Sequence, residues 1–124
     1  MKRRATVKLR MALRELDESR QIVMARSGGR CERCGDRATQ CHHRRPRMAG
    51  GSTAIGMNAP SNLCALCSDC HLTVESHRAA AIEAGWLLSS LAHAERVAIR
   101  LHTGRWVRLL TDGTYEDVTE GGAA

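Results

Sequence analysis

The sequence predicts a small α+β domain organised around a bound metal, with one helix before the central core and short strands after it. Two Cys-x-x-Cys pairs enclose a segment of 32 residues. A helical periodicity precedes the first pair, and short apolar runs separated by turn residues flank the second. Large apolar side chains are scarce, with no Phe, one Tyr and two Trp. A small domain with so little core commonly gains stability from a metal.

The N-terminal region predicts a frayed basic tail over residues 1–10, then a helix over about 12–25. Ser27-Gly28-Gly29 ends this helix, because glycine readily adopts the left-handed conformation of a helix C-terminus. The helical period is carried by Leu9, Leu13, Leu16 and Val23, with Arg20 at the intervening position. We expect this helix to be a packing element, whose arginines could also contact a phosphate backbone.

The central region predicts two short strands, over 38–43 and 63–66, separated by a loop over 48–59. A helix rich in Ala follows over 68–84, and Gly85 is its stop signal. Together with the cysteine pairs, these elements form a predicted core of residues 29–85. Residues 1–28 are the basic tail and helix that precede it.

The C-terminal region, residues 86–124, is predicted to be a β-hairpin extension. An irregular link or single helical turn spans 89–95. The predicted strands are 97–101, 105–110 and 115–118, and Asp112-Gly113 is a tight-turn signal before the last of them.

Charge is unevenly distributed along the chain. The net charge is +6 overall, but residues 1–47 carry fourteen Lys/Arg and five Asp/Glu (+9), and residues 48–124 carry five and eight (−3). The basic half favours a polyanionic partner. Composition alone is equally compatible with a solvated basic face.

All six cysteines lie in the central stretch, at positions 31, 34, 41, 64, 67 and 70. Charged residues interrupt the N-terminal region before an apolar run of about 7 to 15 residues can form, so no signal peptide is predicted. No apolar run reaches the roughly 18 residues of a membrane span. We therefore expect a cytoplasmic protein without membrane contact, in which close cysteine pairs indicate metal or redox sites.

Cys31, Cys34, Cys67 and Cys70 match the ligand set of a structural Zn²⁺ site. Cys64-x-x-Cys67 is an alternative pair. We prefer Cys67 and Cys70 because they fall at a predicted helix start, where the helix dipole stabilises thiolates. Cys64 would then be a small buried strand residue. A redox dithiol is the competing interpretation, but the expected strand–helix context is missing.

Histidines and a glutamate between and after these pairs suggest a second metal site. His42 and His43 are neighbours on a predicted strand, so their side chains point to opposite faces. His71 and Glu75 are one helical turn apart and share a face. Imidazole and carboxylate ligands suit a divalent metal bound beside a phosphate. The alternative is that these are ordinary structural or surface histidines.

These residues resemble the HNH endonucleases, which have a ββα-metal fold, and in particular the zinc-stapled bacteriophage type. The resemblance covers about 50 of the 124 residues. The matching pieces are His42-His43 with the HHRRPRMAGG run, Asn62-Leu63, and Leu66-Cys67-x-x-Cys70-His71.

The resemblance implies a role for each residue. His43 corresponds to the general base, and Asn62 to the residue that fixes the loop holding that base. His42 and His71 correspond to ligands of a catalytic divalent ion (Mg²⁺, Mn²⁺, Ni²⁺ or Zn²⁺), although Asp is frequent at position 42 in the family. Glu75 stands where some members have a further histidine ligand.

The implied reaction is metal-dependent hydrolysis of DNA phosphodiester bonds, by nicking or double-strand cutting, that leaves 5′-phosphate and 3′-hydroxyl ends. Arg44, Arg45 and Arg47 follow the base and could neutralise flanking phosphates. We expect weak sequence preference and strong salt dependence. The resemblance also implies a role in phage DNA processing or packaging, alongside a terminase or other packaging proteins, in the cytoplasm of a bacterial host.

Two other functions compete with this hypothesis. A non-catalytic zinc module that binds nucleic acid or another protein would explain the cysteines and the basic half, but not the two adjacent histidines with Asn62 and His71. A redox or metal-sensing switch would need an easily oxidised dithiol.

Overall fold

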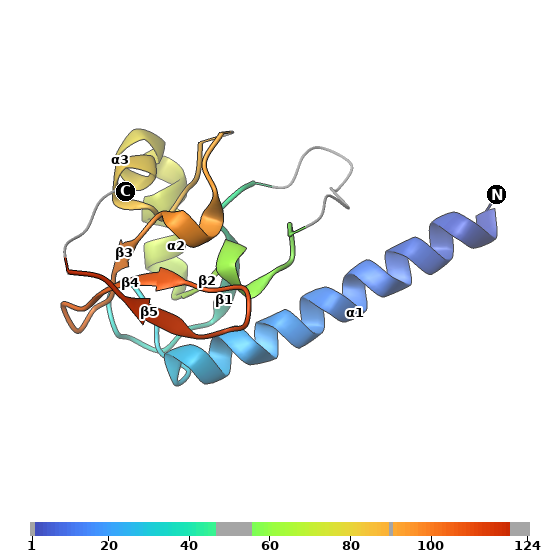
Figure 1. Ribbon diagram of the computed structural model, residues 1–124, viewed down its shortest axis with the longest axis horizontal. Helices are drawn as coiled ribbons and strands as arrows, with labels where there is room; N and C mark the ends of the chain where they lie inside the picture. Colours follow the sequence, from blue (N-terminus) through green and yellow to red (C-terminus); the bar gives the residue numbers. More distant parts are fainter. Residues whose placement is uncertain (1, 47–55, 90, 120–124) are drawn as a thin grey trace.

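A two-stranded antiparallel hairpin followed by two short helices forms the centre of the fold. The computed structural model describes residues 2–46, 56–89 and 91–119, with side chains from residue 7 onward. Strand β1 (Gln40–His43) pairs with β2 (Leu63–Leu66), and α2 (Ser68–Ser76) and α3 (Arg78–Ala84) follow (Figure 1). The predicted α+β class, with a ββα core, is confirmed.

The register of the hairpin decides which face each side chain occupies. His42 lies opposite Cys64, and His43 lies opposite Leu63. Partner residues of an antiparallel pair share a face, and successive residues alternate between faces. Cys64 belongs to the core cluster shared with α2 and the C-terminal strands, whereas Leu63 packs against the N-terminal helix. The two adjacent histidines therefore lie on opposite faces.

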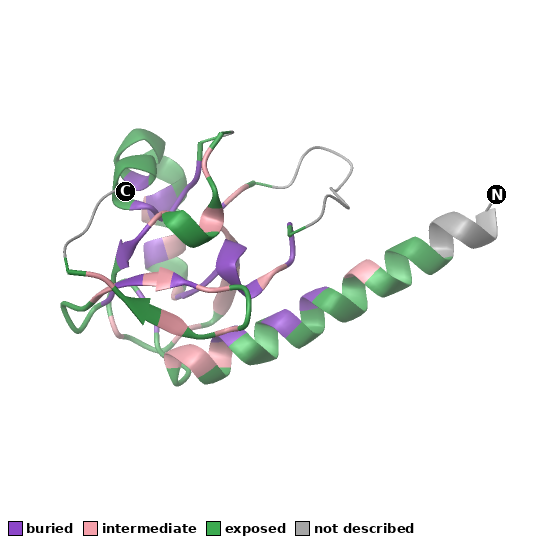
Figure 2. Ribbon diagram, viewed as in Figure 1, coloured by how far each residue is buried: buried purple, intermediate pink, exposed green. Residues whose placement is uncertain are grey.

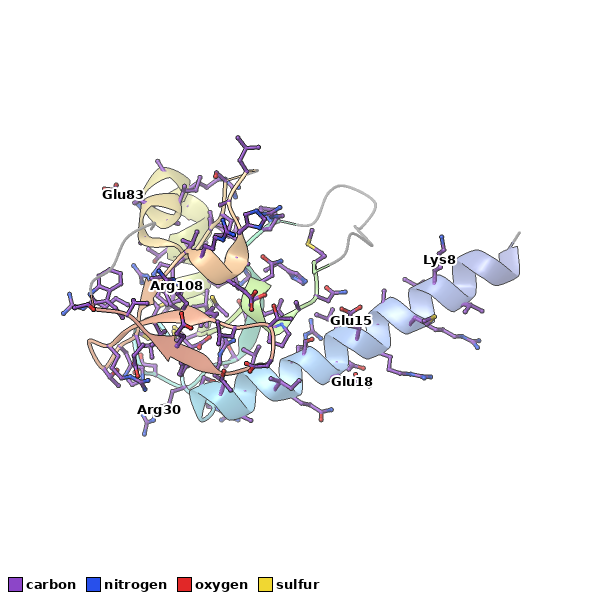
Figure 3. All side chains as sticks on the ribbon, in the orientation of Figure 1. Lys8, Glu15, Glu18, Arg30, Glu83 and Arg108 are labelled. Carbon is purple, nitrogen blue, oxygen red and sulfur yellow. The ribbon has the colours of Figure 1, made fainter. Side chains whose placement is uncertain are left out.

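Helix α1 (Lys2–Ser27) is longer than the sequence predicts, so the expected frayed tail over 1–10 is wrong for residues 2–10. No Gly or Pro precedes Gly28, so nothing interrupts the helix. Its buried residues are Leu16, Ser19 and Val23, whereas Leu9 is 56% exposed. Figures 1 and 2 show the N-terminal half extending away from the body, and Figure 3 shows charged side chains such as Lys8 along it.

The helix predicted over 68–84 is divided in two at His77. This residue has φ −121° and ψ 62°, outside the helical region, and it caps the end of α2 and the start of α3. The predicted stop at Gly85 is confirmed, with φ 86°. A Cβ at this position would lie 2.5 Å from the Ala98 carbonyl oxygen, so the close approach of the C-terminal region also requires glycine.

The C-terminal region forms a three-stranded antiparallel sheet in the order β3-β4-β5, as predicted from three short strand signals. A single turn η2 (Ala94–Arg96) precedes β3 (Ile99–Arg100), β4 (Trp106–Leu109) and β5 (Tyr115–Asp117), and another turn, η1 (Pro60–Asn62), precedes β2. Ile99, Val107 and Leu109 share one core with Cys64 and Leu66 of the hairpin. Residues on both sides of position 85 thus build the same core, and the division at 85/86 stays a prediction.

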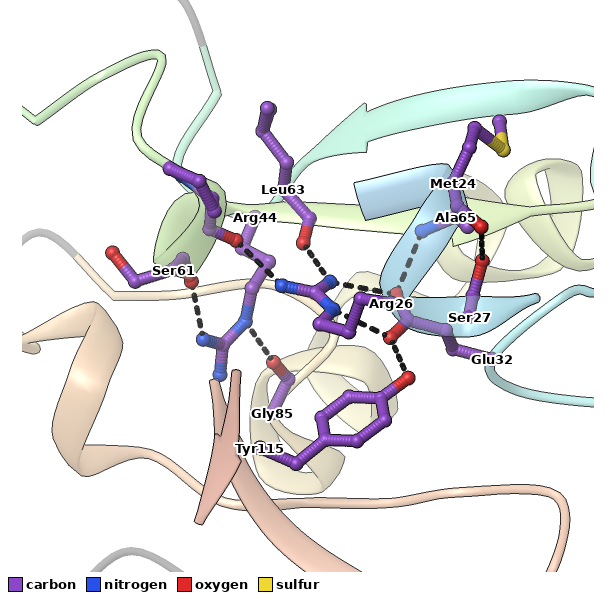
Figure 4. A network of polar contacts seen from close by, with 11 residues as sticks. Met24, Arg26, Ser27, Glu32, Arg44, Ser61, Leu63, Ala65, Gly85 and Tyr115 are labelled. Carbon is purple, nitrogen blue, oxygen red and sulfur yellow. Dashed lines mark hydrogen bonds and ion pairs between the residues drawn. The ribbon is translucent and has the colours of Figure 1, made fainter. Parts of the chain in front are cut away.

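A buried ion pair joins α1 to the first cysteine pair. The Arg26 guanidinium donates to both carboxylate oxygens of Glu32, at 2.9 and 3.1 Å, and both side chains are almost fully buried. The Ala65 N–H and the Tyr115 hydroxyl donate to the same carboxylate (Figure 4). A buried ion pair of this kind is costly to break from one side, because the remaining charge is uncompensated. The network therefore fixes α1 against β2 and β5.

Within the part of the chain that the structure describes, no helix combines the length and apolar character needed to cross a membrane.

Candidate metal centres and active site

Four cysteine sulfurs come together between the turn over residues 31–35 and the start of α2. The Sγ atoms of Cys31, Cys34, Cys67 and Cys70 all lie within 4.8 Å of one another. The Cys34 and Cys67 sulfurs are 3.7 Å apart. Zn–S bonds of about 2.3 Å in a tetrahedron place sulfurs about 3.8 Å apart. The donor set and the spacing fit a structural zinc ion.

Local geometry prepares this cluster. Gly35, at φ 88°, allows the tight turn after the first pair. Cys67 is the N-cap of α2, and its sulfur accepts a hydrogen bond from the Cys70 N–H at 3.4 Å. The Arg33 guanidinium donates to the Cys70 sulfur at 3.3 Å. These N–H groups and the positive charge stabilise thiolates, the form that binds zinc.

Cys64 is not part of the sulfur cluster. It is fully buried in β2, and burial raises the pKa of its thiol to about 12. The structure thus brings together the pair Cys67 and Cys70, not the alternative pair Cys64 and Cys67.

A second cluster combines β1 with α2. His42, His71 and Glu75 each offer a ligand atom, and these atoms lie within 4.8 Å of one another. His42 Nδ1 is 3.7 Å from Glu75 Oε1, and His71 Nε2 is 3.8 Å from the same oxygen. The two imidazole ring centres are 4.9 Å apart. Two imidazoles and a carboxylate are a donor set that binds divalent metals.

The outer nitrogens of both rings are held by oxygen acceptors. His42 Nε2 lies 2.9 Å from the Trp86 carbonyl oxygen, and His71 Nδ1 contacts the Gln40 side-chain oxygen. Because these oxygens only accept hydrogen bonds, the outer nitrogens carry the protons. His42 Nδ1 and His71 Nε2 then keep lone pairs directed to the Glu75 side. Such partners orient metal-binding histidines.

Burial also favours the ligand form of His42. The residue is 2% exposed, and its burial is the main reason why its pKa is lowered to about 4. The imidazole is therefore neutral near pH 7. The Glu75 side chain is 43% exposed and forms an ion pair with Arg78. The cluster is consequently closed on the His42 side and open on the Glu75 side, as expected when a metal must also contact a substrate.

His43 lies on the other face of β1. Its Nε2 is 2.9 Å from the Asn58 side-chain oxygen, and the Asn58 amide donates to the Ala12 carbonyl oxygen at 3.5 Å. An amide oxygen only accepts, so Nε2 carries the proton and Nδ1 is the basic nitrogen of this ring. The sequence did not indicate Asn58, because its loop carries no periodic signal. Gln40 could have been found, since it shares a strand face with His42.

Asn62 ties together the segments that flank the His43 side of the hairpin. Its side chain donates to the Met57 carbonyl oxygen at 2.8 Å and accepts from the Arg45 N–H at 2.9 Å. Its own carbonyl oxygen accepts from the Arg44 N–H. These bonds hold the chain directly after His43, but Asn62 itself is not a ligand in either cluster.

The expectation that Arg44 contacts DNA is wrong, because this side chain is fully buried. Its guanidinium donates to four carbonyl oxygens and connects the end of β1 to the C-terminal region. Those carbonyls belong to Gly85, Ser61, Ala94 and Val97, and Figure 4 shows the bonds to Gly85 and Ser61. Arg45 is half-buried and donates to the Ala92 carbonyl oxygen. Arg47 lies outside the described residues.

The fold and the two clusters define a small α+β protein with a ββα core and two groups of side chains that could hold metal ions. Residues 31–77 match the HNH endonuclease family. The matched segment includes both ligand clusters, His43 and Asn62. Members of this family are generally nucleases. Comparisons with curated proteins and with solved structures gave no significant match.

Proposed function

We propose that this protein is a metal-dependent endonuclease that hydrolyses DNA phosphodiester bonds. The observation that carries the proposal is the cluster of His42, His71 and Glu75, open on one side, beside His43 on the same strand. A zinc module that only binds nucleic acid needs the four cysteines but has no use for this second donor set.

The position of β1 supports a reaction that uses residues on both of its faces. β1 belongs to a two-stranded sheet, so its outer edge is not paired with any strand among the described residues. A phosphodiester lying along this edge is accessible from both faces. The His42 side would hold the divalent ion, and the His43 side would face the attacking water.

Each group in the two faces has one chemical task. When bound by His42, His71 and Glu75, a divalent ion supplies positive charge to a phosphoryl oxygen and to the leaving oxygen. His43 accepts a proton from water as the water oxygen bonds to phosphorus, and Asn58 orients the His43 ring. The bond from phosphorus to the 3′ oxygen breaks, and this oxygen leaves as a hydroxyl after taking a proton from solvent. The products carry 5′-phosphate and 3′-hydroxyl ends.

DNA as the substrate is supported by the family and by the charge distribution. Residues 1–47 carry a net charge of +9, and β1 lies inside this basic half. Cleavage assays with Mg²⁺, Mn²⁺, Ni²⁺ and Zn²⁺ would identify the catalytic ion and distinguish nicking from double-strand cutting. A role in phage DNA packaging beside a terminase stays a prediction from the resemblance.

The proposal is tested with His43→Ala on a DNA duplex, with each of the four ions added in turn. We expect cleavage to fall by at least about 100-fold, because the general base is lost. Zinc content and thermal unfolding should not change. The matched control is His93→Ala, which removes an exposed histidine far from β1 in sequence.

Two results would contradict the proposal. Wild-type protein that binds the duplex yet cleaves it with none of the four ions would favour the non-catalytic zinc module. Full cleavage by His43→Ala would show that another group takes the water proton.

A further inference from the structure

An open hollow of about 420 Å³ joins helix α1 to the candidate active site. It lies along β1 and reaches the His71 ligand of the second cluster. Its lining residues are Arg20, Met24, Thr39, Gln40, Cys41 and His71. One wall is therefore α1, the floor is β1 and the residue before it, and the far end is a candidate metal ligand.

Helix α1 packs against β2, and its residues Arg20 and Met24 line the hollow opposite β1. Met24 and Cys41 both line the hollow. Further along α1, the Ala12 carbonyl oxygen accepts a hydrogen bond from the Asn58 side chain, which also contacts His43. The same helix thus passes both the His71 end and the His43 end of β1. A nucleic acid strand lying along β1 would have α1 beside it.

Arg20 is the one charged residue among those that line the hollow on the α1 side. It is exposed, and it forms no hydrogen bond or ion pair with any residue that the structure describes. By contrast, Arg26 and Arg44 are held by acceptors in the protein. The backbone of Arg20 is well anchored, because Ser19 and Val23 on the same helix are buried. An anchored cation without a protein partner is suited to bind an anion.

We infer that Arg20 is a substrate-positioning residue that binds a phosphate of the cleaved strand next to the phosphodiester at the His42, His71 and Glu75 cluster. This inference rests on the proposed nuclease function. The hollow carries no Asp or Glu among its lining residues, so nothing there opposes a phosphate. The planar guanidinium donates two parallel hydrogen bonds to phosphate oxygens, which fixes the strand in register as well as adding affinity.

The test compares Arg20→Ala, Arg20→Lys and a control, Arg100→Ala, in the full-length zinc-loaded protein. Arg100 is exposed on β3, is likewise without a hydrogen bond or ion pair among the described residues, and does not line the hollow. Duplex binding is measured over a series of KCl concentrations in the His43→Ala background, without added divalent ion. Cleavage is measured separately with His43 intact.

We expect Arg20→Ala to weaken duplex binding about tenfold and to reduce the salt slope of log K by about 0.9, the value for one lost phosphate contact. KM should rise about as much, with a smaller change in kcat. Arg20→Lys should recover part of the affinity and the whole slope. Arg100→Ala should match the parent protein, and zinc content and Tm should be equal in all variants.

Arg20→Ala and Arg100→Ala with equal binding, salt slope and KM would overturn the inference while leaving the nuclease proposal intact. If the protein shows no cleavage with any of the four ions, but its duplex binding still depends on Arg20, the phosphate contact is supported and the nuclease proposal is refuted. If the parent protein binds no duplex, both are overturned.

Discussion

The two metal-ligand clusters are built from almost the same stretch of chain but differ in how complete they are. Cys70 and His71 are adjacent on α2, yet successive residues on a helix point about 100° apart, so each serves a different cluster. The sulfur cluster has four donors, which complete a tetrahedron. The second has three donors and an exposed side. A saturated site can only hold structure together, whereas an unsaturated one leaves room for a substrate.

The side chains and backbone groups that surround the ligands also differ between the two clusters. The cysteines are supported by backbone N–H groups and by Arg33, which favour thiolates. The imidazoles are supported by oxygen acceptors, which fix their tautomers, and burial lowers the pKa of His42 to about 4. The groups around each cluster are therefore of the type that its own ligands bind: hydrogen-bond donors around the sulfurs, and acceptors around the imidazoles. The following predictions test this division from the largest expected effect to the smallest.

Cys31→Ser should abolish zinc binding and unfold the central region, because the free energy of binding a structural zinc is largely folding free energy. Far-UV circular dichroism and zinc content measure this. Cys41→Ser, at a half-buried cysteine outside the cluster, should keep both. A folded Cys31→Ser protein without zinc would show that the sulfur cluster does not maintain the fold.

His71→Ala should leave zinc and fold unchanged but remove binding of the second divalent ion, measured by calorimetry with Mn²⁺. Cleavage should fall by about 1,000-fold or more, because charge stabilisation by the ion is lost. Leu72→Ala, on the neighbouring residue that is 68% exposed, is the control. Unfolding of the His71→Ala protein would make the second cluster structural as well.

Gln40→Ala should lower the affinity for the second ion by about 10- to 100-fold, because His71 loses the acceptor that orients its ring. Gln40→Glu retains an acceptor at the same place and should restore the affinity. Equal Mn²⁺ affinity in Gln40→Ala and wild type would mean that the His71 ring is oriented without this contact.

Arg33→Ala should accelerate zinc release to a chelator by only a few-fold, since one hydrogen bond to a thiolate contributes about 1 kcal/mol. Arg37→Ala, at another exposed arginine three residues after Cys34, is the matched control. If Arg33→Ala released zinc as slowly as the control, its bond to the Cys70 sulfur would have no part in holding the metal.

Predictions that depended on short-range geometry were the successful ones. Strand β2 has its predicted bounds, and Gly85 ends α3 as expected. The alternation of side chains along a strand predicted opposite faces for His42 and His43, and the register of β1 with β2 agrees. Predictions of where a helix begins or breaks were less accurate: α1 extends to Lys2, and a break at His77 had no signal in the residue type.

The sequence by itself determined the zinc-ligand spacing, the histidine pair and the ββα order, because each depends on neighbours within a few residues. The tertiary structure alone decided which arginines are available to a ligand. The sequence gives no reason to treat the neighbours Arg44 and Arg45 differently. In the structure, however, Arg44 is buried, because the carbonyl oxygens of residues 61, 85, 94 and 97 accept hydrogen bonds from its guanidinium. Arg20, which the sequence places at an intervening position of the apolar stripe, lines the hollow because α1 packs against β2, the partner strand of β1. Such positions depend on contacts between distant segments, which no local pattern encodes.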